Sequence, residues 1–366
     1  MSELDMDLNA LRDSVRKVVQ SELTSARLHK HVDDGALIDS ALWQTAATLG
    51  WPALVVAEDQ GGLGLGVGET SIVFEELGAA LAPLPFLGAV LATRALQIGG
   101  SAAQQARWLP GIASGETLCA LAEPKWDATA KPTLKREGAA IVLTGTAGDL
   151  LQGADAGLLI IRAYENGTDC FVVVEPKADH ITLTLDQTVD RTRHLGRAVF
   201  YDLRLPTDRL LSASSPDRLG AILHAEASLA LACESIGGAK AIFGRTIDYL
   251  KIREQFGRPI GSFQALKHRC ADHEVALASS TAVVRESVRL YAEGAPSALM
   301  MVALAKAYAC ETFAKVAEDA VQLHGGIGFT WEQDCHLFLK RAKFNQALFG
   351  TSAAQLDYAA DLLIAS

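Results

Sequence analysis

The segment VQLHGGIGFTWEQD (321–334) decides how the chain around it is interpreted. Residues 299–323 lead into it; they are rich in Ala, carry apolar residues at helical spacing and lack Pro and Gly, so they predict a helix. Glycine commonly ends a helix, but three glycines within residues 325–328 leave main chain with no side-chain cover. This pattern predicts either a tight turn between helices or a place where a ligand closely approaches the backbone.

A second unusual segment, REQFGRPIGSFQ (253–264), lies upstream. Arg253 and Arg258 flank the point where the chain leaves a predicted helix. Guanidinium groups bind phosphate in a bidentate manner, and the amides of Gln255 and Gln264 offer neutral hydrogen bonds. Taken alone, the segment indicates either a solvated helix end or a phosphate-binding one.

Composition limits the classes of protein and partner. With 366 residues, 49% of them hydrophobic, the chain suits two or three domains. A net charge of −10 argues against a nucleic-acid partner. No apolar run reaches the length of a membrane span and residues 1–20 lack the core of a signal peptide, so we expect a cytoplasmic protein with no membrane partner. The six cysteines form no CxxC pair, which predicts buried thiols and no metal site.

Three regions differ in their hydrophobic pattern. Residues 1–116 carry apolar residues at helical spacing and predict an N-terminal helical domain. Residues 117–206 contain short β-rich runs separated by turn residues, which predict a small antiparallel β-domain. Residues 207–366 return to long helical patterns with short breaks and predict a helical bundle. We therefore expect an α+β fold, mainly α, with the β-domain in the middle.

Local signals place the boundaries of several predicted helices. Ser101 stands where an N-cap would begin a helix over 101–115. Within the predicted bundle, GRPIGS (257–262) separates the first long helix from the second, and AEGAPS (292–297) separates the second from the third. Such short turns predict antiparallel neighbours.

Three long segments together resemble the acyl-CoA dehydrogenase superfamily of flavoproteins. They are YLKIREQFGRPIGSFQALKHRCAD (249–272), VQLHGGIGFTWEQDCHLFLKRAK (321–343) and LVVAEDQGGLGLGVGETSIVFEELGAALAP (54–83). The resemblance covers nearly the whole chain. It implies a C-terminal four-helix bundle and a tetramer in which FAD lies between subunits.

The resemblance also implies which residues contact FAD. One set belongs to the RxxFG and FQ motifs, a second set comes from the QxxGG segment of a neighbouring subunit, and a third follows the usual position of the catalytic base. In this chain they are Arg253, Gln255, Phe256 and Gln264; Gln322, His324, Gly325 and Gly326; and Gly350 and Thr351. The close approach of a dinucleotide would explain the bare backbone at residues 325–328.

The reaction implied by the resemblance is α,β-dehydrogenation of an acyl-CoA thioester, in fatty acid or steroid side-chain degradation. A carboxylate removes the α-proton while the β-hydrogen leaves as hydride to flavin N5. The α-proton is weakly acidic, so hydrogen bonds to the thioester carbonyl and a base within reach are both needed. An electron-transferring flavoprotein is the implied electron acceptor.

The catalytic base departs from the family pattern. The family's usual Glu position is Phe349 in the segment LFGTS (348–352), and a phenyl ring cannot accept a proton. Some branches carry the Glu on the first bundle helix, at a position that corresponds to Ala227. Glu226 is adjacent, although about 100° away around a helix, and Glu234 lies on the same face two turns further on. We expect Glu226 to be the stronger candidate for the base.

The β-domain departs from the family pattern as well. The family's Trp-x-Thr segment, which covers the flavin ring, reads Asp149-Leu150-Leu151, so both the aromatic shield and a hydroxyl are missing. Trp126 is a possible substitute. In TVDRTRHLGRAVFYDLRL (188–205), Asp190, Arg191 and Arg193 predict either a salt-bridged turn, which we favour, or a group that approaches CoA phosphates.

Three functional hypotheses follow. The first is a self-sufficient FAD-dependent dehydrogenase, a homotetramer that uses Glu226. The second is a base-lacking subunit of a heteromeric acyl-CoA dehydrogenase, an α2β2 heterotetramer in which this chain completes a partner's FAD site. The third is a flavin-free interaction scaffold.

Overall fold

The computed structural model describes residues 3–122, 131–176, 179–212 and 216–365. The chain divides into two compact units, which are described separately. The helical unit comprises Met1–Asp34, Val67–Ala82 and Ser228–Ser366, and the sheet unit comprises Gly35–Gly66 and Pro83–Ala227. The expected α+β fold, mainly α and in the order helices, sheet, helices, is confirmed. The domain boundaries after residues 116 and 206 remain predictions.

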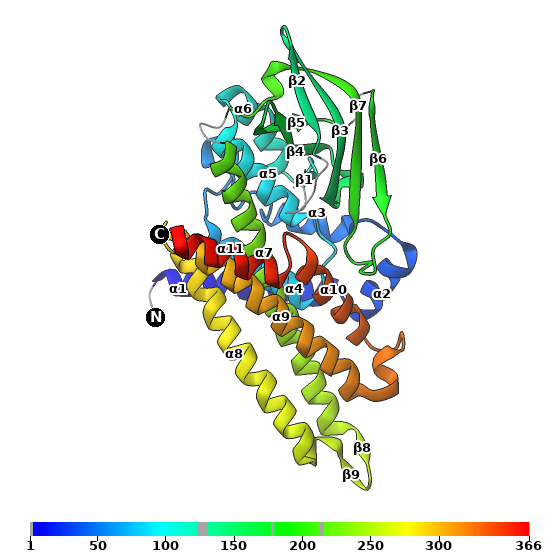
Figure 1. The fold of residues 1–366 in the computed structure, drawn as a ribbon. Coiled ribbons are helices and arrows are strands. Elements are labelled where there is room, and N and C mark those ends of the chain that lie inside the picture. The colour runs from blue at the N-terminus through cyan, green and yellow to red at the C-terminus, as the bar shows by residue number, and fades with distance from the viewer. Residues whose placement is uncertain (1–2, 123–130, 177–178, 213–215, 366) are drawn as a thin grey trace. The chain divides into compact units, whose positions relative to one another are not determined.

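The helical unit is built around three long helices. Its elements are α1 (Glu3–Glu22), α2 (Ser25–Asp34), α4 (Val67–Ala79), the second part of α7 (Pro216–Ile252), β8 (Glu254–Gln255), β9 (Arg258–Pro259), η4 (Ile260–Ser262), α8 (Gln264–Ala292), α9 (Ala298–His324), η5 (Gly325–Phe329), α10 (Cys335–Ala347) and α11 (Ser352–Ala365). Both predicted breaks separate consecutive long helices, as expected. α8 and α9 run side by side, and the hairpin of β8 and β9 lies at one end of the unit (Figure 1).

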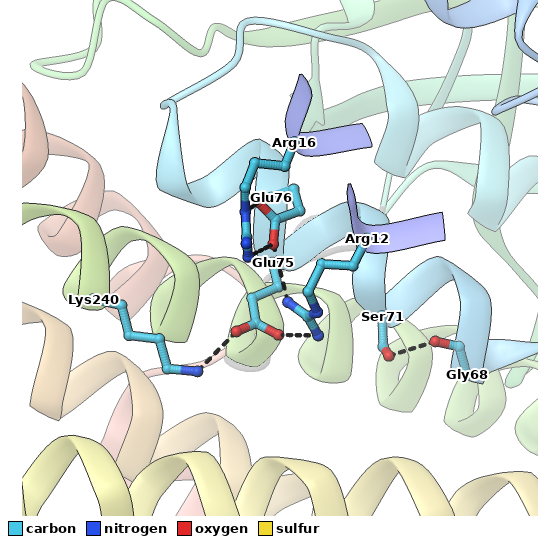
Figure 2. A network of polar contacts seen from close by, with 7 residues as sticks. All are labelled: Arg12, Arg16, Gly68, Ser71, Glu75, Glu76 and Lys240. Carbon is cyan, nitrogen blue, oxygen red and sulfur yellow. Dashed lines mark hydrogen bonds and ion pairs between the residues drawn. The ribbon is translucent and has the colours of Figure 1, made fainter. Parts of the chain in front are cut away.

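The first part of the chain is tied to this unit by a network of ion pairs (Figure 2). Glu75 on α4 accepts from Arg12 of α1 at 2.8 Å and from Lys240 of α7 at 2.8 Å. Glu76 pairs with Arg12 at 3.0 Å and with Arg16 at 2.9 Å. Burial alone would raise the pKa of Glu75, but Lys240 and Arg12 lower it below its usual value. The network therefore joins α1, α4 and α7 through charged carboxylates.

The sheet unit contains one seven-stranded sheet. Its elements are α3 (Ser40–Thr48), η1 (Glu58–Gln60), α5 (Phe86–Gly99), α6 (Ala102–Ala113), β1 (Cys119–Ala122), β2 (Thr133–Glu137), β3 (Ala140–Leu151), η2 (Gly153–Asp155), β4 (Leu158–Glu165), β5 (Thr168–Val174), β6 (Ile181–Asp186), β7 (Leu195–Pro206), η3 (Thr207–Arg209) and the first part of α7. The strand order is β1-β4-β2-β3-β7-β6, with β5 on β4. β1 and β2 both pair parallel to β4, so the sheet is mixed and the purely antiparallel domain that we expected is a simplification.

Two sequence features explain how helices join this sheet. Ser101 caps α6 in a capping box with Gln104, which confirms the predicted helix start. Gly88 of α5 lies against β1, where an added Cβ would stand 2.0 Å from the carbonyl oxygen of Cys119. Only glycine permits this approach, and it brings α5 onto the sheet.

α7 is the one helix in the described residues that is long and apolar enough to cross a membrane. The share of its apolar window that is buried inside the protein is 83%. Burial of this extent is typical of a core helix.

Candidate active site

The hairpin that follows α7 presents the first predicted cofactor segment. Gln255 of β8 pairs with Arg258 of β9, so Phe256 and Gly257 form the two-residue turn. Their φ angles are +56° and +75°. Two successive left-handed residues are what a tight hairpin turn requires, and Phe256 is a non-glycine residue that carries this strain. Its side chain is 90% exposed.

The polar groups of this hairpin differ in how they are engaged. Arg253 is exposed, and its guanidinium has no ion pair or side-chain hydrogen bond with any residue that the structure describes. Arg258, in contrast, stacks on the ring of Phe263 at 4.1 Å from the ring centroid. The amide of Gln255 donates to the carbonyl of Glu254 at 2.8 Å, and Gln264 is exposed at the start of α8. Arg253 is therefore the group in the hairpin that is ready to bind an anion.

The glycine segment combines a tight turn with exposed backbone, whereas the predicted approach of a ligand stays a prediction. An added Cβ at Gly328 would stand 2.5 Å from the carbonyl oxygen of Val321, so this glycine is needed for a tight turn. Gly325 and Gly326 are exposed, and an added Cβ would meet nothing within 4 Å at either position. Gly325 has φ 64° and ψ −142°, a conformation that is essentially restricted to glycine. The first two glycines thus leave open backbone that packing does not explain.

His324 lies inside the helical unit, although it was predicted to contact the cofactor. It is 5% exposed, and its ring stacks on Tyr249 with 4.4 Å between centroids. Nδ1 lies 2.7 Å from the carbonyl oxygen of Ala320, which places the ring proton on Nδ1. Burial lowers the pKa of His324. The ring therefore braces the glycine segment against the end of α7, whereas Gln322 beside it is exposed.

This stacking brings the two predicted cofactor segments to the same end of the helical unit. The hydroxyl of Tyr249 donates to the carbonyl oxygen of His324 at 3.4 Å. Tyr249 is four residues before Arg253, about one helical turn, or roughly 6 Å. The helix end that carries Arg253 and the bare glycine backbone thus lie at the same end of the unit within one chain.

The third predicted segment is the loop of residues 348–351. Phe349 and Gly350 have φ angles of +53° and +92°. The carbonyl of Phe349 accepts from Gln355 at 2.7 Å, and the carbonyl of Gly350 accepts from Lys306 at 2.5 Å. Thr351 is exposed and caps α11 by accepting from the backbone of Ala354 at 3.3 Å. No carboxylate stands at position 349.

Glu226, the predicted base, is engaged by an arginine within the sheet unit. Its side chain is 8% exposed, and Oε1 accepts from Nε of Arg94 at 2.9 Å. The guanidinium of Arg94 is held in turn by Gln97 at 3.2 Å, which donates to the carbonyl of Val55 at 2.9 Å. Oε1 of Glu226 is therefore already engaged by an ion pair within the sheet unit.

Glu234, the second candidate, belongs to a buried polar cluster in the helical unit. It is 2% exposed and lies 3.5 Å from the guanidinium of Arg341, itself 1% exposed. Asn345 contacts both Glu234 at 3.5 Å and Ser235 at 3.2 Å. Removing one member of such a pair leaves an uncompensated buried charge, so the position of Glu234 indicates a structural role.

The remaining predictions concern the sheet unit. Leu150 and Leu151 are buried at the end of β3, which provides no hydroxyl there. Trp126 lies outside the described residues. Asp190 is 2% exposed and accepts from the backbone and hydroxyl of Thr192 at 2.9 and 2.6 Å, so it lies in a turn; the salt-bridged form that we favoured stays a prediction. Arg193 is likewise buried, at 3% exposure.

The cysteines form no disulfide bonds. All six cysteines are unpaired; Cys170 is half-buried and the others are buried. Burial raises the pKa of Cys335 to about 11, so this thiol is not reactive at neutral pH. Within the described residues, no group of three or more His, Cys, Asp or Glu side chains is arranged to hold a metal ion.

Sequence reasoning missed four residues that organise these segments: Arg94, Tyr249, Lys306 and Gln355. Lys306 alone gave a signal, because a lysine inside the apolar stretch LMMVALAKAYAC (299–310) interrupts a face that should be buried. The others resemble ordinary helix-surface residues in the sequence. Their roles depend on contacts far apart along the chain.

Comparison with known proteins gives consistent results. Family profiles match over residues 5–116, described as "Acyl-CoA dehydrogenase, N-terminal domain", and over residues 225–364, described as "Acyl-CoA dehydrogenase, C-terminal domain". The acyl-CoA dehydrogenase IpdE2 of Mycolicibacterium smegmatis is 33% identical over 94% of this chain and 95% of its own length. The protein of the same name from Mycobacterium tuberculosis is 34% identical over 91% of this chain and 89% of its own length.

Among solved structures, a variant of the steroid ACAD Tcur3481-Tcur3483 superimposes with a TM-score of 0.89 and 26% identity. The match covers 99% of this chain and 99% of the other. Helix order, the two C-terminal signature segments and near full-length similarity all agree. The chain belongs to the acyl-CoA dehydrogenase family.

Proposed function

We propose that this chain takes part in FAD-dependent α,β-dehydrogenation of an acyl-CoA thioester as the subunit that holds flavin but does not supply the base. The observation that carries the proposal is the state of the three candidate positions. Phe349 has no carboxylate, Glu226 is paired with Arg94, and Glu234 is paired with Arg341. A partner chain would then provide the base, in an α2β2 heterotetramer in the cytoplasm.

The described residues fit a flavin dinucleotide. Arg253 offers an unengaged guanidinium, and the exposed main chain at Gly325 and Gly326 leaves room for a phosphate or ribose. Bound FAD would accept the β-hydrogen of the acyl chain as hydride. The protein's part is to bind the diphosphate through Arg253, to contact the cofactor through Gln255, Phe256, Gln264 and Gln322, and to exclude water from it.

The relatives favour a heteromeric assembly and a bulky acyl group. The solved relative at 26% identity is described as a steroid ACAD, and its description names two proteins, Tcur3481 and Tcur3483. By analogy, we propose a steroid side-chain thioester as the substrate class, with fatty acyl-CoA as its nearest competitor. We propose an electron-transferring flavoprotein as the electron acceptor.

A second candidate is a self-sufficient homotetramer that uses Glu226 as the base. The observation in its favour is the 34% exposure of the Arg94 side chain, because a partly solvated arginine can be displaced at a low energetic cost. In that case substrate binding would release Glu226. The flavin-free scaffold is the third outcome that an experiment must separate.

Absorption spectroscopy of the purified chain distinguishes these cases. Our proposal predicts a yellow protein whose flavin band does not bleach when a steroid or fatty acyl-CoA is added anaerobically. Bleaching by the chain alone, lost in Glu226→Gln, would instead establish the self-sufficient enzyme. Colour that develops only when a partner chain is co-expressed also supports the proposal, whereas a protein that stays colourless in every condition would leave only the scaffold.

A further inference from the structure

The loop of residues 348–351 is held by two buried side chains that donate to successive carbonyl groups. Lys306 on α9 is 0% exposed, and its ammonium reaches the carbonyl of Gly350. Gln355 on α11 is 2% exposed and donates to the carbonyl of Phe349. Gln355 also lies 3.4 Å from the hydroxyl of Ser228, which fixes its amide from the other side.

These two bonds determine where the neighbouring N–H groups point. In a trans peptide, the C=O and the following N–H are antiparallel. Since the carbonyls of Phe349 and Gly350 are directed at buried donors, the N–H groups of Gly350 and Thr351 are directed away from those donors. In the described part of the chain, neither N–H group has a hydrogen-bond acceptor. Thr351 is exposed and Gly350 half-buried, so a ligand can reach this part of the loop.

Burying the amine of Lys306 to hold this loop costs free energy. Burial lowers the pKa of Lys306, since the charged form loses solvation there, although Cys310 opposes this effect slightly. A methionine of similar length would fill the same volume without a polar group. The cost of burying an amine is consistent with a requirement for one fixed loop conformation, in which two residues have positive φ.

We infer that Lys306 and Gln355 are positioning residues for the cofactor site: they fix two adjacent peptide groups so that the N–H groups of Gly350 and Thr351 form a paired donor site for acceptor atoms of the bound flavin. This inference rests on the proposed function, which supplies the ligand. Lys306 and Gln355 themselves do not contact the flavin. They act through the two carbonyl groups.

The test is FAD titration of the full chain and its variants Lys306→Met and Gln355→Leu, monitored by the visible flavin spectrum. The dissociation constant for FAD should rise about tenfold in each variant, the equivalent of one lost hydrogen bond of about 1.4 kcal/mol. The fine structure of the flavin band should also change, since its hydrogen-bond donors move. Val316→Ala is the matched control: it removes buried volume from the same helix, ten residues from Lys306, and should lower the melting temperature without changing affinity or spectrum.

Amide hydrogen exchange adds a measurement that does not depend on affinity. FAD should slow exchange at Gly350 and Thr351 in the wild-type chain, and this protection should be reduced in both variants. If Lys306→Met fails to fold, Gln355→Leu carries the test, because it removes a neutral donor.

The outcomes separate this inference from the proposed function. A wild-type chain that binds FAD, with both variants retaining its affinity, spectrum and exchange protection, overturns the positioning role alone. A wild-type chain that binds no FAD, either alone or co-expressed with a partner chain, overturns both. A shift in melting temperature without any change in the flavin measurements assigns Lys306 and Gln355 to stability only.

Discussion

Two Phe-Gly pairs in the helical unit adopt the same unusual backbone but are supported in opposite ways. At the hairpin, Phe256 and Gly257 have φ angles of +56° and +75°; at the loop before α11, Phe349 and Gly350 have φ angles of +53° and +92°. The first pair lies at the tip of a hairpin, where Phe256 is 90% exposed and its ring has an edge contact with Phe263 at 6.0 Å between centroids. The second has its carbonyls bound by Lys306 and Gln355. The same local conformation therefore arises once from hairpin geometry and once from long-range contacts.

The difference shows how each pair would serve a site. The hairpin leaves the guanidinium of Arg253 without a side-chain partner among the described residues, which suits a contact completed by another subunit or by a ligand. The second loop is fixed before any ligand arrives, which suits groups that must keep one orientation. Matched substitutions at the two pairs test whether the hairpin and the loop differ in this way.

The largest effect is expected at the hairpin arginines. Arg253→Ala should weaken FAD binding by about 10- to 100-fold, because a charge-assisted contact to phosphate contributes about 1.5–3 kcal/mol. Arg258→Ala is the matched control, since its guanidinium is occupied by the ring of Phe263. Isothermal titration with FAD measures both. Equal losses for the two variants would mean that the hairpin responds to net charge and that Arg253 has no specific role.

Alanine at the two glycines should separate strain from crowding. Gly350→Ala should lower the free energy of unfolding by about 2 kcal/mol, because a new Cβ at positive φ would also lie 3.2 Å from Gln355. Gly257→Ala should cost only about 1 kcal/mol, as no atom lies within 4 Å of the added Cβ. Urea unfolding of both variants gives the comparison. A larger loss at Gly257 would show that the hairpin is the more tightly packed of the two.

The buried amine should make the second loop sensitive to pH. The pKa of Lys306 is below its unfolded value because of burial, so between those two values the unfolded chain binds the extra proton. Stability therefore rises with pH through this window and levels off above the unfolded pKa of about 10.4. The free-energy difference between wild type and Lys306→Met, measured by urea unfolding from pH 6 to 10, should shift toward wild type as pH rises. A difference that is constant with pH contradicts the lowered pKa.

The smallest effect is expected at the exposed phenylalanine. Phe256→Ser should change the free energy of unfolding of the isolated chain by about 0.5 kcal/mol or less, since the ring is almost fully in solvent. Phe349→Ser, at the half-buried position, should cost about 1–2 kcal/mol. Thermal unfolding in parallel measures the pair. A clear destabilisation at Phe256 would reveal packing that the structure of one chain does not contain.

The sequence predicted the elements whose signals are local. The long helices, the capping role of Ser101 and the breaks at 257–262 and 292–297 follow from periodicity and from residues that end helices. The parallel pairings of β4 could not be predicted, because register between distant strands leaves no mark in either strand alone. The open backbone at Gly325 and Gly326 was predicted from composition, whereas the packing role of Gly328 required the position of Val321.

The site residues also divide into those predicted from local sequence and those that depend on tertiary contacts. The exposed state of Arg253 agrees with a motif-based assignment, whereas the stacking of His324 on Tyr249 and the pairing of Glu226 with Arg94 depend on tertiary contacts. A sequence shows which residues are present but not which of their atoms are already engaged. For a charged side chain, that second property decides whether the group is available for chemistry.

The ion pairs that join α1 to α4 and α7 have a consequence for how the chain is made. Glu75 forms ion pairs with both Arg12 and Lys240. Arg12 leaves the ribosome long before Lys240. At about 5–20 residues per second, the interval between the two is on the order of ten seconds or more. During this time Arg12 and Arg16 of α1 can already pair with Glu75 and Glu76 of α4, but Glu75 still lacks its second cation. The network is therefore completed late in synthesis, when the middle of α7 brings Lys240 to Glu75.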